Sequence, residues 1–292
     1  MAIVSRAILE AVPFPVEPVF QMRPGLERCP GELSDHLSPV SPPAFTQAQQ
    51  AVELALNRKR LPLVMSFDGQ TQTRAGCLQA LQAARIRLVD DQAEIGAAHG
   101  APEGLPACAL ALRRSIQDDF VLMVPDGADA PVPGMLRAAV LSVAAPSGWD
   151  PAGVVGLDFA RIHRPVPEAA LIQSAAVPLS RLMLDGAVWR RFVWTLSETP
   201  ELSQHPADQT PGSASGLDEI YFRSERQLLV PLPGHNAVIF LIRVFVAPLS
   251  EVLSVDPARA GLLRQSLQSM SPAVLSYKRL AQVKELVLAA LP

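Results

Sequence analysis

The sequence predicts an α+β domain, with an antiparallel sheet of roughly five strands flanked by helices from both ends of the chain. Apolar and alternating runs of strand length lie in its middle, and helical periodicity lies on either side. The clearest hairpin joins residues 220–230 to 237–246 across a short connection that contains proline, glycine and asparagine. The second of these strands is apolar on both faces, so we expect it to lie centrally in a covered sheet.

Further segments have the pattern of strands. Residues 119–124 and 137–145 are apolar runs joined by a proline- and glycine-rich connection, which indicates a hairpin with a long loop. Residues 188–196 alternate, with Trp189 on one face and Trp194 on the other. Upstream of these, residues 61–67 are predicted to form a short strand.

The helical segments are marked by periodicity and by capping residues. Asp256-Pro257 and Ser271-Pro272 each place a capping side chain before a proline that suits the first turn of a helix. Pro178 is expected to interrupt the helix that contains it. Helices are therefore predicted at 46–60, 73–84, 168–183, 256–270 and from 271 to the last residues.

The N-terminal part differs in composition from the rest. The first 45 residues are rich in proline and have little periodicity, so we expect an extended arm with a turn at Arg23-Pro-Gly-Leu26. We divide the chain into residues 1–110, an arm and helical region packed on the core, and residues 111–292, the core with the C-terminal helices. Residues 91–106 are predicted to be a loop.

Composition limits the classes of function. Hydrophobic residues make up 49% of the chain and charged residues 18%, as in globular proteins. The net charge of -3 argues against general nucleic-acid binding, because there is no basic excess to displace phosphate counterions. No apolar run approaches the roughly 20 residues of a membrane helix, and prolines break the first residues, which excludes a secretory signal. We therefore expect a cytoplasmic protein without membrane contact.

The common cofactor and catalytic motifs are absent. Cys29, Cys77 and Cys108 are far apart and form no Cys-x-x-Cys pair, which argues against an iron–sulfur cluster or structural zinc on this chain. There is also no Gly-x-Gly-x-x-Gly, no Walker lysine, no Gly-x-Ser-x-Gly and no His-Glu-x-x-His. Nucleotide binding and the commonest hydrolytic mechanisms therefore have no local support.

His163 is the most informative single residue. It lies in the run Ala160-Arg-Ile-His-Arg-Pro-Val-Pro167, where the prolines restrict the backbone and push Arg164 and Val166 towards extended conformations. We therefore expect it on a stiffened strand or loop. Imidazole is the commonest ligand of transition metals and binds haem iron, which requires a held geometry. The alternative is an ordinary core or surface histidine beside a turn.

Charged residues interrupt the strands of the central hairpin. Arg223 and Glu225 share one face of a strand that should be half-buried, Arg226 lies beside them, and Arg243 interrupts the apolar partner strand. One interpretation is an Arg–Glu ion pair that closes one end of the sheet. The other is a cluster of guanidinium groups for an anion, because the planar fork of arginine binds carboxylates bidentately.

The aromatic residues allow two interpretations as well. Trp189 and Trp194 suit either core packing or an aromatic wall against a flat cofactor. Tyr277-Lys278, on the last predicted helix, suits a packed tyrosine beside a solvated lysine. The remaining histidines are expected at the surface: His36, His99, His205 and His235.

Six segments occur in the order and spacing of one known family. The chain resembles the haem-dependent oxidative N-demethylase α-subunit-like proteins, which include dimethylamine monooxygenase subunits. The resemblance covers about 119–280 and is weaker upstream, at Pro13-Phe14, Arg23–Leu26 and Lys59-Arg60. The segments are Pro146–Trp149, Arg161–Pro167, Trp189–Trp194, Phe222–Gln227, Ile242–Leu249 and Tyr277-Lys278.

The resemblance implies a PAS-like fold, with haem b in a pocket between an antiparallel sheet and flanking helices. It implies an oxidoreductase, a monooxygenase that uses O2 to oxidise a small secondary amine to a primary amine and formaldehyde. Electrons are expected from NADPH through FMN and 2Fe-2S centres on partner subunits, not on this chain. The partners are therefore an amine, O2 and redox subunits, in a homo- or hetero-oligomer.

The resemblance also implies roles for matching residues. His163 is expected to bind the haem iron, with its other N–H fixed by a carbonyl or carboxylate such as Asp158. Trp189 and Trp194 are expected to line the pocket.

The resemblance implies roles for the charged residues in binding the haem propionates and the substrate. Arg223, Arg226 and Arg243 are expected to neutralise haem propionates or to hold the pocket edge. Glu225 is expected to orient one of these arginines or to be the counter-charge of an ammonium substrate, which makes Glu225 and Arg226 the predicted catalytic pair.

Two alternatives stay open beside the enzyme. One is a haem-binding sensor without turnover, and the other is a PAS-like subunit that has lost haem. The first would have a Soret band and the second would not. We prefer the enzyme, because the sequence has no room for a fused output domain.

Overall fold

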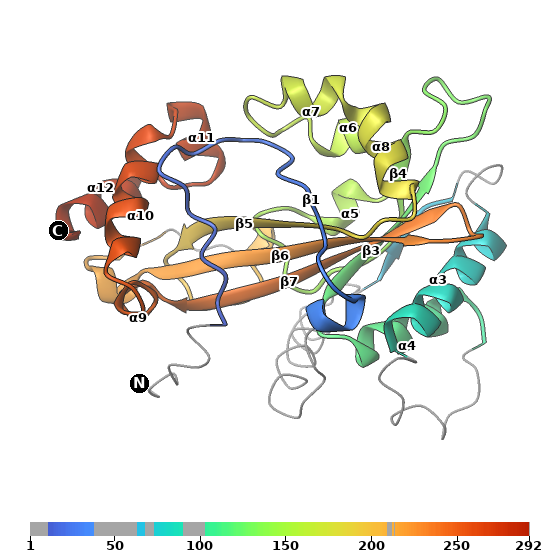
Figure 1. Cartoon of the computed structure of the whole chain (residues 1–292), viewed down its shortest axis with the longest axis horizontal. Coiled ribbons are helices and arrows are strands. Elements are labelled where there is room, and N and C mark those ends of the chain that lie inside the picture. Colours follow the sequence, from blue (N-terminus) through green and yellow to red (C-terminus); the bar gives the residue numbers. More distant parts are fainter. Residues whose placement is uncertain are drawn as a thin grey trace.

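A seven-stranded antiparallel sheet forms the centre of the molecule, in the order β1-β5-β6-β7-β3-β4-β2 (Figure 1). The computed structural model describes residues 11–37, 63–67, 73–89, 103–208, 212 and 214–291. The predicted α+β class is confirmed, and the short edge strand β1 is added to the predicted strands. The strands are β1 (Glu27–Arg28), β2 (Val64–Met65), β3 (Asp119–Pro125), β4 (Leu136–Ser142), β5 (Trp189–Ser197), β6 (Tyr221–Leu232) and β7 (Ala237–Pro248).

The hairpin β6–β7 is the longest pairing, and its register runs from Tyr221↔Pro248 to Leu232↔Ala237. Its turn places Gly234 and Asn236 in left-handed conformations, which these two residue types tolerate best. As predicted, β7 lies inside the sheet, where β6 and β3 flank it.

One face of the sheet is covered by α3 (Arg74–Val89) and α4 (Leu105–Ser115), and we call it the α4 face (Figure 1). Side chains such as Leu81 and Leu112 are buried there with Phe120 and Leu241. The predicted helix 73–84 is confirmed and extends to Val89. Helix α4 was not predicted, and most of the loop predicted at 91–106 lies outside the described residues.

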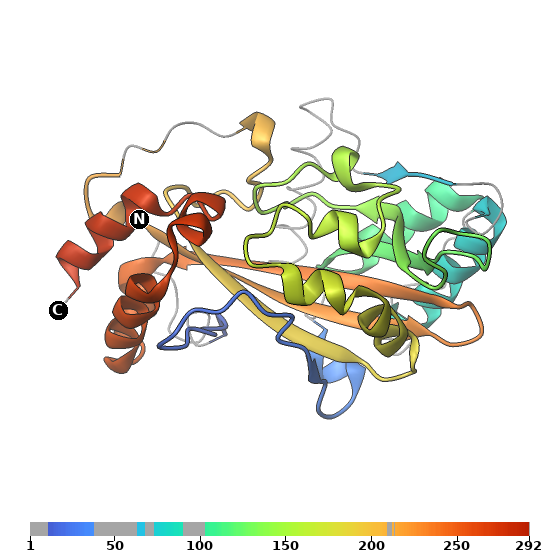
Figure 2. The ribbon, with the colours of Figure 1, turned by 90° about the horizontal axis from the view of Figure 1, so that it is seen from above.

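The opposite face carries α5 (Pro151–Val154), α6 (Phe159–Ile162), α7 (Ala170–Ser174) and α8 (Ala176–Leu184), and we call it the α6 face (Figures 1 and 2). The predicted helix 168–183 is divided at Ala175, not at Pro178. Pro178 lies in the first turn of α8, where its missing N–H breaks no helical hydrogen bond.

The C-terminal helices pack at the end of the hairpin away from its turn (Figure 2). The predicted caps are present, because Asp256 Oδ1 accepts from the Ala258 N–H at 2.9 Å and Ser271 Oγ from the Val274 N–H at 3.3 Å. The last predicted helix is divided in two, and Arg279 has a positive φ of 57° in the break. The helices are α9 (Leu249–Ser254), α10 (Ala258–Ser269), α11 (Pro272–Tyr277) and α12 (Ala281–Ala290).

The N-terminal arm runs from the C-terminal helices to β1, beside the edge of β5 (Figure 1). Val12 and Val16 are buried, and Phe14 stacks on Phe222 at 5.0 Å between ring centroids. Short 3-10 turns lie at Leu33–His36, Pro206–Asp208 and Leu217–Glu219.

Residues upstream of the predicted domain boundary contribute to the same sheet. The boundary at residue 110 lies within α4, and β1 and β2 pair with β5 and β4, which follow it. The helix predicted at 46–60 lies outside the described residues, and the strand predicted at 61–67 is described only from residue 63. Within the described part, none of the helices combines the length and the apolar character needed to cross a membrane.

Candidate functional site

The predicted site residues divide between the two faces of the sheet. Directly paired residues of neighbouring strands share a face, and the register pairs Glu225 with Val193 and Arg226 with Arg243. Side-chain alternation therefore separates the predicted set. Trp189, Arg223 and Glu225 lie on the α6 face with His163, whereas Trp194, Arg226 and Arg243 lie on the α4 face.

His163 directly follows the short helix α6 as its C-cap and begins a turn, so of the predicted strand or loop the structure has the loop. Asp158 caps this helix, because its Oδ1 accepts from the Arg161 N–H at 2.8 Å. Phe159 anchors the helix in the apolar core of the α6 face. His163 has φ −91° and ψ 0°, and its carbonyl accepts from the Val166 N–H at 3.1 Å in the following turn. The backbone at His163 is thus fixed by a cap, a core anchor and a turn.

The imidazole of His163 is held by Phe159. Its Nδ1 lies 2.8 Å from the Phe159 carbonyl oxygen, and the centroids of the His163 and Phe159 rings are 4.3 Å apart. Because a carbonyl only accepts, Nδ1 carries the proton and the Nε2 lone pair is free of it. Burial lowers the pKa of His163, and the charge of Arg191 lowers it further, against the hydrogen bond to Phe159. Among the described residues, Nε2 has no hydrogen-bond partner.

Asp158 does not fix the imidazole, although the sequence suggested it as one option. Its carboxylate caps α6 and pairs with Arg161 Nε at 3.4 Å. Of the two predicted acceptors, a carbonyl or a carboxylate, it is the Phe159 carbonyl that accepts the hydrogen bond from His163.

Glu225 is held on the α6 face by two neutral donors. Ser147 Oγ donates to Glu225 Oε1, and Gln227 Nε2 donates to Oε2 at 2.6 Å. Arg223 Nε donates to the same Ser147 hydroxyl at 2.9 Å. The side chains of Arg223 and Glu225 therefore meet at Ser147, where the sequence left an ion pair open as one possibility.

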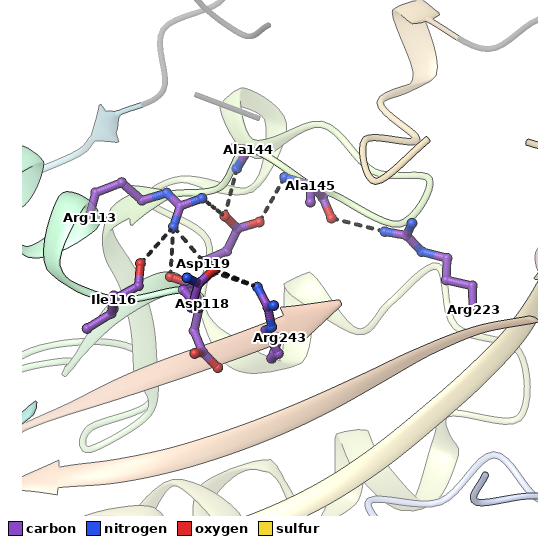
Figure 3. A network of polar contacts seen from close by, with 9 residues as sticks. Arg113, Ile116, Asp118, Asp119, Ala144, Ala145, Arg223 and Arg243 are labelled. Atoms are coloured by element: carbon purple, nitrogen blue, oxygen red, sulfur yellow. Dashed lines mark hydrogen bonds and ion pairs between the residues drawn. The ribbon is translucent and has the colours of Figure 1, made fainter. Parts of the chain in front are cut away.

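Arg223 belongs to a buried polar network (Figure 3). Its side chain is 1% exposed, and Nη2 donates to the Ala145 carbonyl at 3.1 Å. The N–H groups of Ala144 and Ala145 donate to Asp119, which also pairs with Arg113 at 3.1 Å. This network fastens the segment that follows β4, including Ser147, to the sheet.

The charged residues of the α4 face have protein partners. Arg226 pairs with Asp118 at 3.2 Å, and Arg243 Nη1 donates to Gln117 Oε1 at 3.1 Å. The Arg243 guanidinium also lies over the Phe245 ring at 5.6 Å, and burial lowers its pKa.

The two tryptophans are in different surroundings. Trp194 is buried against Phe222 and Phe20 in the core beside the C-terminal helices. Trp189 packs on α8, and its Nε1 donates to the Leu182 carbonyl at 3.2 Å. It also lines a groove of about 510 Å³ together with Leu179, Leu182 and residues 23–27 of the arm.

Arg191 is a residue of this face that the sequence reasoning did not select. It lies two positions after Trp189, on the same side of β5, and its Nη2 donates to the Arg23 carbonyl at 3.5 Å. Burial lowers its pKa, against the opposing charges of Glu225 and Tyr277. Strand alternation predicts the face on which Arg191 lies, but its partial burial without an ion pair among the described residues depends on tertiary packing.

Most of these residues lie within a range that matches a known protein family. The family described as haem-dependent oxidative N-demethylase, alpha subunit-like matches residues 85–288, which is more than half of the chain. The chain belongs to this family. The matched range includes β3 to β7 and the site residues of the α6 face, but not those of the N-terminal arm. It confirms the resemblance seen in the sequence. Membership relates this α-subunit-like chain to haem-dependent oxidoreductases.

The donor set of this α-subunit-like chain fits a haem. Haem iron takes its equatorial ligands from the porphyrin and needs only one or two from the protein. His163 could offer one imidazole whose Nδ1 is fixed and whose Nε2 is unpaired among the described residues, an arrangement typical of metal-binding histidines. Within the described ranges, histidine, cysteine and acidic side chains form no cluster of three or more that would hold an ion by themselves.

Tyr277 and Lys278 have exchanged their predicted environments. Tyr277 is 47% exposed, whereas Lys278 Nζ donates to the Trp194 carbonyl at 2.7 Å and lies over the Phe20 ring at 5.2 Å. Among the described residues, β5 has no strand partner beside Trp194 on this edge, so the lysine satisfies a carbonyl that a neighbouring strand would otherwise bind. Burial lowers the pKa of Lys278 to about 8, with Glu225 opposing and Arg191 adding to the shift.

Replacing Lys278 with methionine is expected to flatten the alkaline stability profile. The folded-state pKa of about 8 lies below the ordinary value of 10.5, so the unfolded chain binds more protons between these limits. Stability from this group is therefore present above the unfolded pKa and is lost as the pH falls through about 8. Urea midpoints from pH 7 to 9.5 test this, with Lys284→Met as the control. Equal slopes for wild type and Lys278→Met would contradict it.

Proposed function

We propose that this protein is the haem-binding subunit of an oxidative N-demethylase, and that His163 binds the iron of haem b. The observation that carries the proposal is the His163 imidazole, whose Nδ1 is fixed by Phe159 and whose Nε2 has no partner among the described residues. Family membership supports the haem, and the sheet with helices on its α6 face is compatible with a PAS-like arrangement.

The overall reaction would convert a secondary amine, O2, two electrons and two protons into a primary amine, formaldehyde and water. When bound, haem supplies the activation of O2, with electrons from FMN and 2Fe-2S centres on partner subunits. The chain itself holds the iron ligand and the substrate. Phe159 orients the imidazole, and the lowered pKa keeps His163 neutral near pH 7, which leaves Nε2 available as a ligand.

Glu225 is the proposed counter-charge for the ammonium form of the amine. Its carboxylate is buried on the α6 face and is oriented by Ser147 and Gln227. Both donors are neutral, so its negative charge is not paired directly with a cation. Arg223 acts through Ser147 and fixes this donor rather than the substrate.

The residues of the α4 face are not part of the proposed cofactor pocket. A planar cofactor bound beside His163 cannot contact Trp194, Arg226 or Arg243 across the sheet. Trp189, on the His163 face and next to the groove, is the tryptophan proposed to line the cofactor pocket.

Absorbance spectra of the purified protein, before and after reconstitution with haem, test the cofactor. We expect a Soret band that shifts on reduction with dithionite and again with carbon monoxide. Release of formaldehyde from dimethylamine, with O2 and an artificial reductant, then tests the reaction. A Soret band without turnover of any small secondary amine would favour a sensor, and the absence of a band after reconstitution would contradict the proposal.

A further inference from the structure

Arg191 is a half-buried cation without an ion pair in the part of the chain that the structure describes. Its Nε atom is buried and has no hydrogen-bond partner among the described residues, and its Nη2 makes one long hydrogen bond, at 3.5 Å, to the Arg23 carbonyl. No carboxylate lies within ion-pair distance of this guanidinium among the described residues, and Glu225 acts on it only through longer-range attraction. Such a group is strongly disfavoured unless a counter-charge reaches it.

Other arginines of the chain have the partners that Arg191 lacks among the described residues. Arg113, Arg137 and Arg190 pair with carboxylates at 3.1, 2.7 and 2.6 Å. Arg223 has no carboxylate within this range, but its nitrogen atoms donate to a hydroxyl and two carbonyls. Arg191 has neither arrangement, so its hydrogen-bonding capacity is left for something other than the described protein groups.

Arg191 lies next to a residue that lines the groove and is also near His163. Arg23, whose carbonyl accepts from Arg191, lines the groove, and so does Trp189 on the same side of β5. Arg191 is also close enough to His163 for its charge to affect the imidazole. A ligand that binds His163 and extends into the groove would pass this guanidinium.

We propose that Arg191 binds a carboxylate of the ligand in this groove, and that this carboxylate is a haem propionate. The inference rests on the proposed function, because it takes haem as the ligand of His163. The planar fork of arginine suits a bidentate carboxylate, and pairing would neutralise the charge of this half-buried guanidinium. This assigns the propionate to Arg191 rather than to Arg223, Arg226 or Arg243, which already have partners.

The test combines a change in the protein with a change in the ligand. Wild type, Arg191→Gln and Arg191→Lys are titrated with haem and with haem dimethyl ester, in which both propionates are neutral. We expect Arg191→Gln to weaken haem binding about 10- to 100-fold, as for the loss of a charge-assisted hydrogen bond, and to leave binding of the ester unchanged. Arg191→Lys should fall between these limits, because it keeps the charge but not the fork.

The controls separate pairing from folding and from charge in general. Arg114→Gln removes an exposed guanidinium on α4 and should bind both ligands as wild type does. Far-ultraviolet circular dichroism and melting curves check that the variants fold. Equal weakening of both ligands by Arg191→Gln would indicate that the residue only holds the arm through Arg23, and unchanged binding of both would also overturn the inference.

A failure of the proposed carboxylate site at Arg191 can be distinguished from a failure of the proposed haem binding. If the wild type binds neither haem nor its ester, the haem proposal fails. Calorimetry with the free carboxylates acetate and benzoate then decides the remaining point. Binding that Arg191→Gln removes would identify a site for a free carboxylate and not a propionate, whereas no binding would overturn the carboxylate site altogether.

Discussion

Replacement of His163 with alanine is expected to abolish stoichiometric haem binding or to shift the Soret band of what remains bound. The variant removes the one imidazole of the α6 face whose Nδ1 is fixed by a carbonyl and whose Nε2 is unpaired among the described residues. Without the His163 imidazole, only contacts with the porphyrin and its propionates would hold the cofactor. Titration of the apoprotein with haem, followed in the Soret region, measures both effects.

The control for this variant is His235→Ala, which removes an exposed histidine from the β6–β7 turn. A second variant, His163→Gly, allows added imidazole to occupy the vacated position. Recovery of the wild-type spectrum with imidazole would assign the loss to ligation rather than to misfolding. A His163→Ala protein with an unchanged spectrum and affinity would exclude His163 as the iron ligand.

The strands were the most predictable part of the fold, because each one has its own periodic signal. The alternation of 188–196 and the apolar run of 237–246 predict β5 and β7 to within two residues. Capping residues predicted the starts of α10 and α11 for the same reason. The breaks at Ala175 and Arg279 were not predictable, since neither residue is a glycine or a proline that would signal the end of a helix.

The site was predictable in part, and the limits have physical causes. The prolines around His163 indicated a fixed backbone, but a helix of four residues such as α6 is too short to have a periodicity. The register places Arg226 and Arg243 on the face of the sheet opposite Glu225, a separation that follows from strand pairing rather than from any local pattern. Ser147 joins Glu225 to Arg223 across 78 and 76 residues of sequence, so no local pattern could reveal it.

Replacement of Asp119 with alanine is expected to destabilise the protein by about 3–5 kcal/mol. Asp119 and Arg113 are each 3% exposed and are paired at 3.1 Å (Figure 3). The variant leaves Arg113 buried without its counter-charge and leaves the N–H groups of Ala144 and Ala145 without their acceptor. Urea unfolding followed by circular dichroism measures the loss, and Asp129→Ala, in the β3–β4 connection, is the control.

The double variant Arg113→Met/Asp119→Leu distinguishes a buried ion pair from two independent contacts. Because the burial of each charge is unfavourable, removing both should cost less than removing Asp119 alone, although the N–H groups of Ala144 and Ala145 stay without an acceptor. Additive losses in the double-mutant cycle would contradict the coupling. The network also fixes the segment that carries Ser147, so the Asp119→Ala variant should weaken the hold on Glu225 as well. If Glu225 binds the amine, this variant, while still folded, should raise the KM for the amine without changing the Soret band.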